Sequence, residues 1–159
     1  MLSQEQTRFL ERAIELSSRG MVSGHGGPFG CVVVKDGSII SEGFNMVTST
    51  NDPTAHAEIV AIRQACHSLG SYQLEGCEIY TSCEPCPMCL GAIYWARPAR
   101  VYFANTRKEA AAIRFDDDFI YEEISTMMHQ RSIPFIHVPD EKAKKVFDDW
   151  NKFTGRKEY

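Results

Sequence analysis

The chain has 159 residues, of which 43% are apolar and 24% are charged, with a formal net charge of -4. This length and composition are typical of one globular domain, and the acidic balance gives no bulk attraction for nucleic acid. The N-terminal stretch lacks the basic start of a signal peptide, and no apolar run is long enough to cross a membrane. We therefore expect one cytoplasmic domain, residues 1–159, with neither a membrane nor a nucleic acid as its partner.

The first half of the chain predicts a helix, a hairpin and a second helix. Apolar residues recur at helical spacing over residues 3–19, and Gly20 is expected to end this helix. The stretch GCVVVKDGSIISEGF, residues 30–44, has a β-branched run on each side of a KDG turn, which is typical of a β-hairpin. Turn-forming residues at 48–53 then lead to a helix that His56 opens.

The second half alternates between strands and helices. Added to the hairpin, this alternation indicates an α/β fold of three α/β/α layers around a mixed five-stranded central sheet, with its binding site at the strand ends. The expected elements are a strand at 77–82, a buried helix at 88–96, strands at 99–105 and 133–138, a helix at 119–124 and a helix at 141–153.

Two short motifs carry the residues of a metal site. His56 and Glu58 stand at one helix start, and Cys86 and Cys89 stand at another. One imidazole and two thiolates suit Zn²⁺ with a fourth position open for water or hydroxide, and Glu58 could then move protons to and from that water. The pattern H-x-E followed by P-C-x-x-C is the known signature of zinc nucleobase deaminases.

Cys83 leaves two other kinds of metal site open. By its spacing it could be the fourth ligand of a structural zinc, or part of an iron-sulfur run of cysteines. Neither alternative explains Glu58, and no cysteine follows Cys89 to complete a cluster. Catalytic zinc is therefore favoured, and Cys83 is expected to be a small unligated residue at a strand end.

These motifs and several longer segments resemble the cytidine deaminase superfamily, and closely resemble the small bacterial guanine deaminases. TSTNDPTAHAE at 48–58 and YTSCEPCPMCLGAIYWARP at 80–98 are largely shared with tRNA adenosine deaminases. FDDDFIYEEI at 115–124 and the terminal KEY are the segments that favour guanine deaminases. The resemblance covers almost the whole chain.

The resemblance implies a cytidine-deaminase-like fold and zinc-dependent hydrolysis of guanine to xanthine and ammonia, a step of purine salvage or nitrogen supply. It assigns His56, Cys86 and Cys89 as the ligands of one Zn²⁺ per subunit, and Glu58 as the proton shuttle. A tRNA adenosine deaminase, or a deaminase of guanosine or cytosine type, shares these four residues. A zinc-stabilised binding module without catalysis is the alternative from another class.

The resemblance also implies contacts with the substrate. Asn45 would hydrogen-bond the purine, and Phe29 would pack on it. The backbone N–H of Ala57 would face the base, and Trp95 would line the pocket. Asp117 would help to transfer a proton to the leaving amine. From the residues alone, Asn45 could be an ordinary turn residue and Trp95 a core residue, and residues Asp116 to Asp118 could cap the helix that follows.

The C-terminal segment has two interpretations. By composition, the tail TGRKEY is a frayed charged end. In the family that the chain resembles, the segment corresponding to about 139–159 is swapped to a partner subunit, where Tyr159 would lie near the base. The resemblance therefore implies a homodimer.

Overall fold

The computed structural model describes residues 2–115 and 117–159, and the chain divides into two compact units, Met1–Ile120 and Tyr121–Tyr159. Each unit is considered by itself. Within the described ranges, none of the helices combines the length and the apolar character that a membrane span needs.

The first unit is built on a four-stranded mixed sheet with the order β2-β1-β3-β4. β1 pairs antiparallel with both β2 and β3, whereas β3 and β4 run parallel. The predicted hairpin is confirmed, and Asp36 and Gly37 form its turn with positive φ angles of 49° and 72°, as a type I′ turn requires. The strands are β1 (Gly30–Lys35), β2 (Ser38–Phe44), β3 (Cys77–Cys83) and β4 (Arg100–Asn105).

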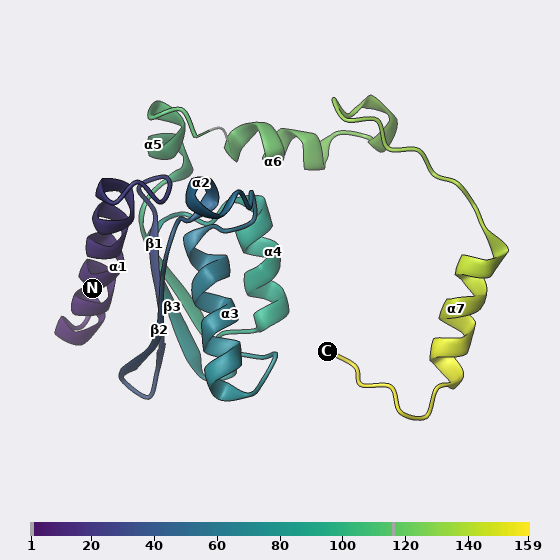
Figure 1. The fold of residues 1–159 in the computed structure, drawn as a ribbon, viewed down its shortest axis with the longest axis horizontal. Coiled ribbons are helices and arrows are strands. Elements are labelled where there is room, and N and C mark those ends of the chain that lie inside the picture. The colour runs from purple at the N-terminus through teal and green to yellow at the C-terminus, as the bar shows by residue number, and fades with distance from the viewer. Residues whose placement is uncertain (1, 116) are drawn as a thin grey trace. The chain divides into compact units, whose positions relative to one another are not determined.

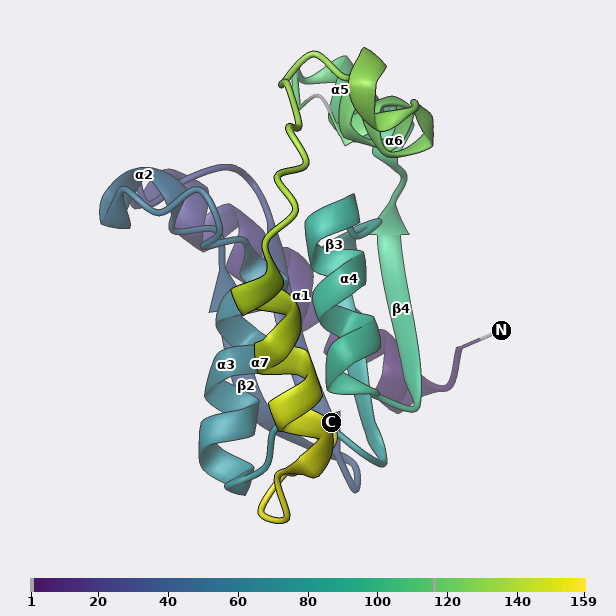
Figure 2. The ribbon, with the colours of Figure 1, turned by 90° about the vertical axis from the view of Figure 1, so that its right-hand side faces the viewer.

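Helices cover both faces of this sheet, as the sequence predicted. Val32 and Val34 of β1 pack with Leu16 on one face, while Cys31 and Val33 belong to the core on the other. Successive side chains of a strand point to opposite faces, so one strand contributes to both cores. The covering helices are α1 (Gln4–Val22) on the first face, and α3 (Ala57–Leu69) and α4 (Pro87–Ala96) on the second (Figures 1 and 2).

The remaining elements are short or lie late in the chain. The first unit also contains α2 (Val47–Thr50) and α5 (Arg107–Ala112), and α6 (Asp117–Ser125) crosses the boundary between the units. The second unit contains the 3₁₀ helix η1 (Met128–Gln130) and the predicted C-terminal helix, α7 (Glu141–Lys152). None of the described residues of the second unit is buried.

Three sequence-based predictions about these elements were wrong. Residues 133–138 form no strand, because they lie in the second unit, whose described residues include no strand with which they could pair. The sheet of the described residues therefore has four strands and not the five predicted. Gly20 lies inside α1, which continues to Val22, and does not end it. The glycine instead allows close packing, since a β-carbon there would come within 2.8 Å of the Phe44 ring. α4 is buried on one side only, and Trp95 on its other side is 63% exposed.

Candidate active site

Two helices begin at metal-ligating residues. His56 is the N-cap of α3 and Cys86 the N-cap of α4, and both have extended backbone conformations. Pro87 follows as the first residue of α4, where its fixed φ suits a helix start. Gly43 of β2 lets α3 approach, because a β-carbon there would lie 2.4 Å from the carbonyl oxygen of Ala57. The sequence thus directs both helix starts to one point.

The three predicted metal ligands converge. The Sγ atoms of Cys86 and Cys89 each lie 3.5 Å from Nδ1 of His56. Nitrogen and sulfur donors on one tetrahedral zinc, at about 2.1 and 2.3 Å from it, lie about 3.6 Å apart. Both the distances and the donor types therefore fit Zn²⁺. Cys83 is not part of this cluster, and its thiol instead lies 3.8 Å from the carbonyl oxygen of Thr106.

The ligands are electrostatically coupled. The hydrogen bond from Cys89, with a further one from His56, lowers the pKa of Cys86 to about 4. The same hydrogen bond between the two thiols raises the pKa of Cys89. The hydrogen bond with Cys86 also raises the pKa of His56. Cys86 is therefore a thiolate at neutral pH, the form in which cysteine binds a metal.

Glu58 lies beside the ligands in the first turn of α3. Its side chain is buried, with one carboxylate oxygen 3.4 Å from Thr81 Oγ1 and the other 3.5 Å from Cys89 Sγ. Burial raises the pKa of Glu58, because a charged carboxylate is disfavoured away from water. A buried carboxyl group with a raised pKa holds a proton more readily than a free carboxyl group, which suits a group that must accept a proton and later donate it.

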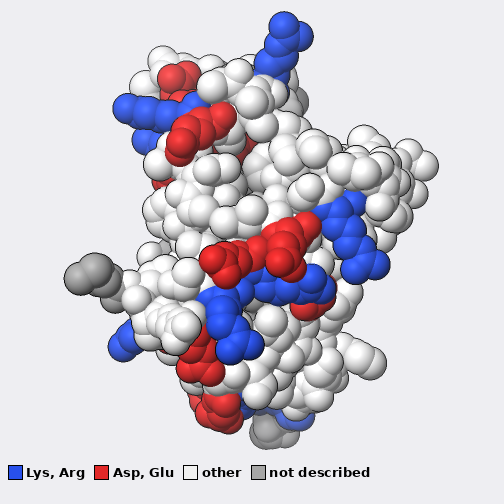
Figure 3. All heavy atoms as spheres, turned by 90° about the vertical axis from the view of Figure 1, so that its left-hand side faces the viewer, with Lys and Arg blue, Asp and Glu red and all other residues white. Residues whose placement is uncertain are grey.

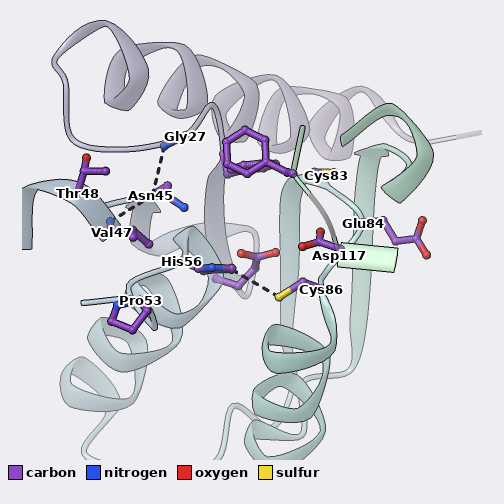
Figure 4. Close-up of a pocket in the computed structure, with 13 residues that line it drawn as sticks. Gly27, Asn45, Val47, Thr48, Pro53, His56, Cys83, Glu84, Cys86 and Asp117 are labelled. Carbon is purple, nitrogen blue, oxygen red and sulfur yellow. Dashed lines mark hydrogen bonds between the residues drawn. The ribbon is translucent and has the colours of Figure 1, made fainter. Parts of the chain in front are cut away.

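A pocket of about 280 Å³ opens beside these residues (Figure 4). A volume of this order fits a small ligand. Sequence reasoning did not identify Thr48, Glu84 or Phe115 as pocket residues, although Glu84 stands inside the cysteine motif and Phe115 opens the FDDDFIYEEI segment. The predicted site residues on its wall are Phe29, Asn45, His56, Glu58, Cys86 and Asp117.

Asn45 is held in one orientation. Its Oδ1 accepts hydrogen bonds from the backbone N–H groups of Gly27, at 3.3 Å, and Val47, at 3.2 Å (Figure 4). Two donors require the oxygen on that side, so the amide Nδ2 is the group that Asn45 can present to a ligand. The buried Asn45 therefore has its amide N–H groups, and not its oxygen, available on the side of the pocket.

Two aromatic rings form another wall of the pocket. Phe29 and Phe115 meet edge to face, with ring centroids 4.7 Å apart and planes at 87°. Gly27 packs against both rings, since a β-carbon at this position would lie 2.7 Å from Phe115 and 3.0 Å from Phe29. The glycine thus leaves room for both rings, which give the pocket an aromatic, apolar wall of the kind that an aromatic base can pack against.

Ala57 and Trp95 are not among the residues that line the pocket. Ala57 is buried at the start of α3, directly between His56 and Glu58. Trp95 lies on the exposed side of α4, away from the pocket wall. Tyr159 belongs to the second unit, so its contact with a substrate stays a prediction. Asp116, proposed as part of a helix cap, lies outside the described residues.

Comparisons with known proteins agree with this geometry. Residues 3–105 match the family described as the cytidine and deoxycytidylate deaminase zinc-binding region. The chain is 56% identical to guanine deaminase from Bacillus subtilis (strain 168) over 95% of this chain and 97% of that protein. It is 35% identical to a tRNA-specific adenosine deaminase from Aquifex aeolicus over 91% and 92% of the two chains.

A solved structure extends the similarity to the fold. The X-ray structure of Bacillus subtilis guanine deaminase matches with a TM-score of 0.94 and 54% identity, covering 99% of both chains. The His/Cys/Cys ligand set and the buried Glu58 are what a zinc-dependent deaminase requires. The chain therefore belongs to the cytidine and deoxycytidylate deaminase family of zinc-binding proteins.

Proposed function

We infer that the chain is a zinc-dependent guanine deaminase, a hydrolase that converts guanine and water to xanthine and ammonia. The observation that carries this inference is the buried carboxylate of Glu58, 3.5 Å from a ligand of the three-residue zinc site. A structural zinc site needs no such carboxylate. The similarity to guanine deaminase over nearly the whole chain supports guanine as the substrate.

The residues divide the chemistry between them. His56, Cys86 and Cys89 would hold Zn²⁺, which supplies a water of lowered pKa as the nucleophile. Glu58 takes one proton from the attacking water and gives it to the ring nitrogen next to the reacting carbon. It then takes the remaining proton of the added hydroxyl group and gives it to the amine, so that the carbonyl forms, the C–N bond breaks and ammonia leaves. Burial, which raises the pKa of Glu58, suits both directions of transfer.

Other residues of the pocket would bind and orient the purine. Nδ2 of Asn45 donates to an acceptor on the base edge, and the ring of Phe29 packs against the base. Asp117, also on the pocket wall, assists proton transfer to the leaving amine. Its position in the first turn of α6 is equally compatible with stabilising that helix.

The tRNA adenosine deaminases share the metal site, but the charge of this chain does not favour binding to RNA. Its net charge is -4. On the face that α1 covers, acidic and basic side chains lie side by side (Figure 3). A phosphate backbone is bound through clusters of lysine and arginine, so this mixed face is poorly suited to RNA. A free purine base, processed in the cytoplasm, remains the substrate that we propose.

We further propose that the two units form one deaminase domain that acts as a homodimer, with about 139–159 swapped to the partner subunit. Phe147 on α7 is 77% exposed, and Trp150 and Phe153 are exposed as well. An amphipathic helix normally buries its apolar face against another surface, and a partner subunit would supply one. On this proposal, Tyr159 contacts the base in the partner's site.

Ammonia release from a panel of substrates tests the proposed activity. The panel contains guanine, guanosine, adenine, cytosine, cytidine and a tRNA anticodon stem-loop, each tested with the wild type and with Glu58→Ala. We expect release from guanine in the wild type and none in Glu58→Ala, with zinc content unchanged. Release from the stem-loop alone would replace our choice of substrate, and an active Glu58→Ala variant would refute the mechanism.

A further inference from the structure

Asp117 lines the pocket and belongs to a segment that follows the last strand of the sheet in the chain. β4 ends at Asn105, and α5 and a short connection follow before α6 begins at Asp117. The ends of β3 and β4 are joined where the backbone N–H of Glu84 donates to the carbonyl oxygen of Asn105, at 2.8 Å. Glu84 lies two residues before the zinc ligand Cys86, and the chain that follows Asn105 leads to Asp117. This hydrogen bond therefore joins the segment that carries the zinc ligand to the segment that leads to Asp117.

The side chain of Glu84 fixes the next element. Its carboxylate accepts a hydrogen bond of 2.9 Å from the backbone N–H of Arg107, the first residue of α5. The N–H groups of a first helical turn have no partner within the helix, and a carboxylate is a strong acceptor for them. Thr106 and Glu109 complete the start of α5 with a reciprocal capping box.

Arg107 then reaches the helix that carries Asp117. Its Nε lies 3.3 Å from Oδ1 of Asp118, the neighbour of Asp117 in the first turn of α6. Glu84 and Asp117 lie on the same side of the pocket, beyond Cys86 (Figure 4). Continuous contacts therefore run from the metal loop through Glu84 and Arg107 to Asp118.

We propose that Glu84, Arg107 and Asp118 are positioning residues that hold Asp117 at the pocket, and we call these three residues the Asp117 bridge. The proposal rests on the role of Asp117 in the proposed function. The Arg107 and Asp118 side chains are 40% and 45% exposed, so their ion pair adds little to stability. A small displacement of a catalytic group nevertheless slows a reaction strongly, so the bridge affects turnover more than folding.

Steady-state kinetics with guanine on the zinc-loaded enzyme test the bridge. We expect Arg107→Ala and Asp118→Asn each to lower kcat by about three- to tenfold, with KM nearly unchanged. Because both variants break the same ion pair, between Arg107 and Asp118, the double variant should be no slower than either single variant. Arg107→Lys keeps the charge and should recover most of the lost turnover.

Arg12 provides a matched control. Its guanidinium holds Glu42 with two hydrogen bonds of 2.8 Å, between α1 and β2, and neither residue lines the pocket. We expect Arg12→Ala to lower the melting temperature at least as much as Arg107→Ala does. Its kcat should stay within about twofold of the wild-type value.

The Asp117→Asn background separates failure of the bridge from failure of the proposed function. If Asp117→Asn lowers kcat, Arg107→Ala added to it should cause no further loss. A further loss of the same size, or single bridge variants with wild-type kcat, would overturn the bridge while leaving the role of Asp117 intact. If Asp117→Asn itself turns over guanine normally, the assigned role of Asp117 is wrong, and the bridge falls with it.

Discussion

The orientation of Asn45 decides what this residue can offer to a substrate. Because Oδ1 is engaged by the backbone N–H groups of Gly27 and Val47, the proposed contact with the base falls to the Nδ2 donor. Asn45→Asp keeps an acceptor for both N–H groups and removes the donor. We expect KM for guanine to rise by about tenfold or more, because a site built to donate a hydrogen bond then faces the base without one.

Kinetics and thermal melting of Asn45→Asp separate binding from folding. The loop that holds Gly27 and Val47 should stay in place, so we expect a melting temperature close to the wild-type value. Asn45→Leu removes both polar groups and provides the comparison, since it should lose stability as well as affinity. An unchanged KM in Asn45→Asp would show that Nδ2 is not a substrate contact.

The C-terminal end of α5 holds an arginine in a conformation that favours glycine. Arg114 has a φ of 71°, and the N–H groups of Arg114 and Phe115 donate to the carbonyls of Ala111 and Ala110. This is the Schellman motif, in which glycine is the usual residue at the left-handed position. A side chain at this position destabilises the folded chain by roughly 1–2 kcal/mol relative to glycine. Part of this advantage of glycine is lost, because glycine has greater conformational freedom in the unfolded chain.

Arg114→Gly should therefore stabilise the protein by about 0.5–1 kcal/mol, or about 2 °C in melting temperature for a chain of this size. Calorimetry on the wild type and the variant measures this difference. Arg114→Ala is the matched control, because it removes the same charge but keeps a β-carbon at positive φ. Equal melting temperatures for the glycine and alanine variants would mean that the backbone of Arg114 is not strained.

The elements that could be predicted from sequence are those whose patterns are local. The turn at Asp36 and Gly37 and the helix that His56 opens depend on a few adjacent residues. The predicted strand at 133–138 depends instead on a distant partner, which no local pattern reveals. The packing role of Gly20 likewise depends on Phe44, a residue that only the folded chain brings close.

The residues of the candidate site likewise differ in whether a local sequence pattern could predict them. His56, Glu58 and the two zinc-binding cysteines were predictable because the spacing of their motifs carries the chemistry. Phe115 was missed, since its contact with Phe29 arises from tertiary packing. Trp95 was assigned to the pocket by resemblance, but helical position alone does not tell which side of α4 faces the site.

The proposed dimer makes a prediction about the whole molecule, because it requires that one subunit complete the site of the other. The second unit exposes apolar side chains on α7, including Phe147 and Trp150, and it ends at Tyr159. We expect sedimentation velocity to give the mass of a dimer. Deleting residues 155–159 should lower turnover much more than melting temperature, because the tail then contributes to catalysis and little to folding.

Mixing two inactive variants tells whether Tyr159 acts within its own subunit or in the partner's site. Glu58→Ala has a dead site but an intact tail, whereas the 155–159 deletion has an intact Glu58 but no tail. After unfolding and refolding together, mixed dimers hold one subunit of each kind. If the tail acts on the partner, one site per mixed dimer is complete, and activity should recover to about a quarter of the wild-type value. Two variants that stay inactive together, although mass spectrometry detects the mixed dimer, would place Tyr159 in its own subunit's site or in neither.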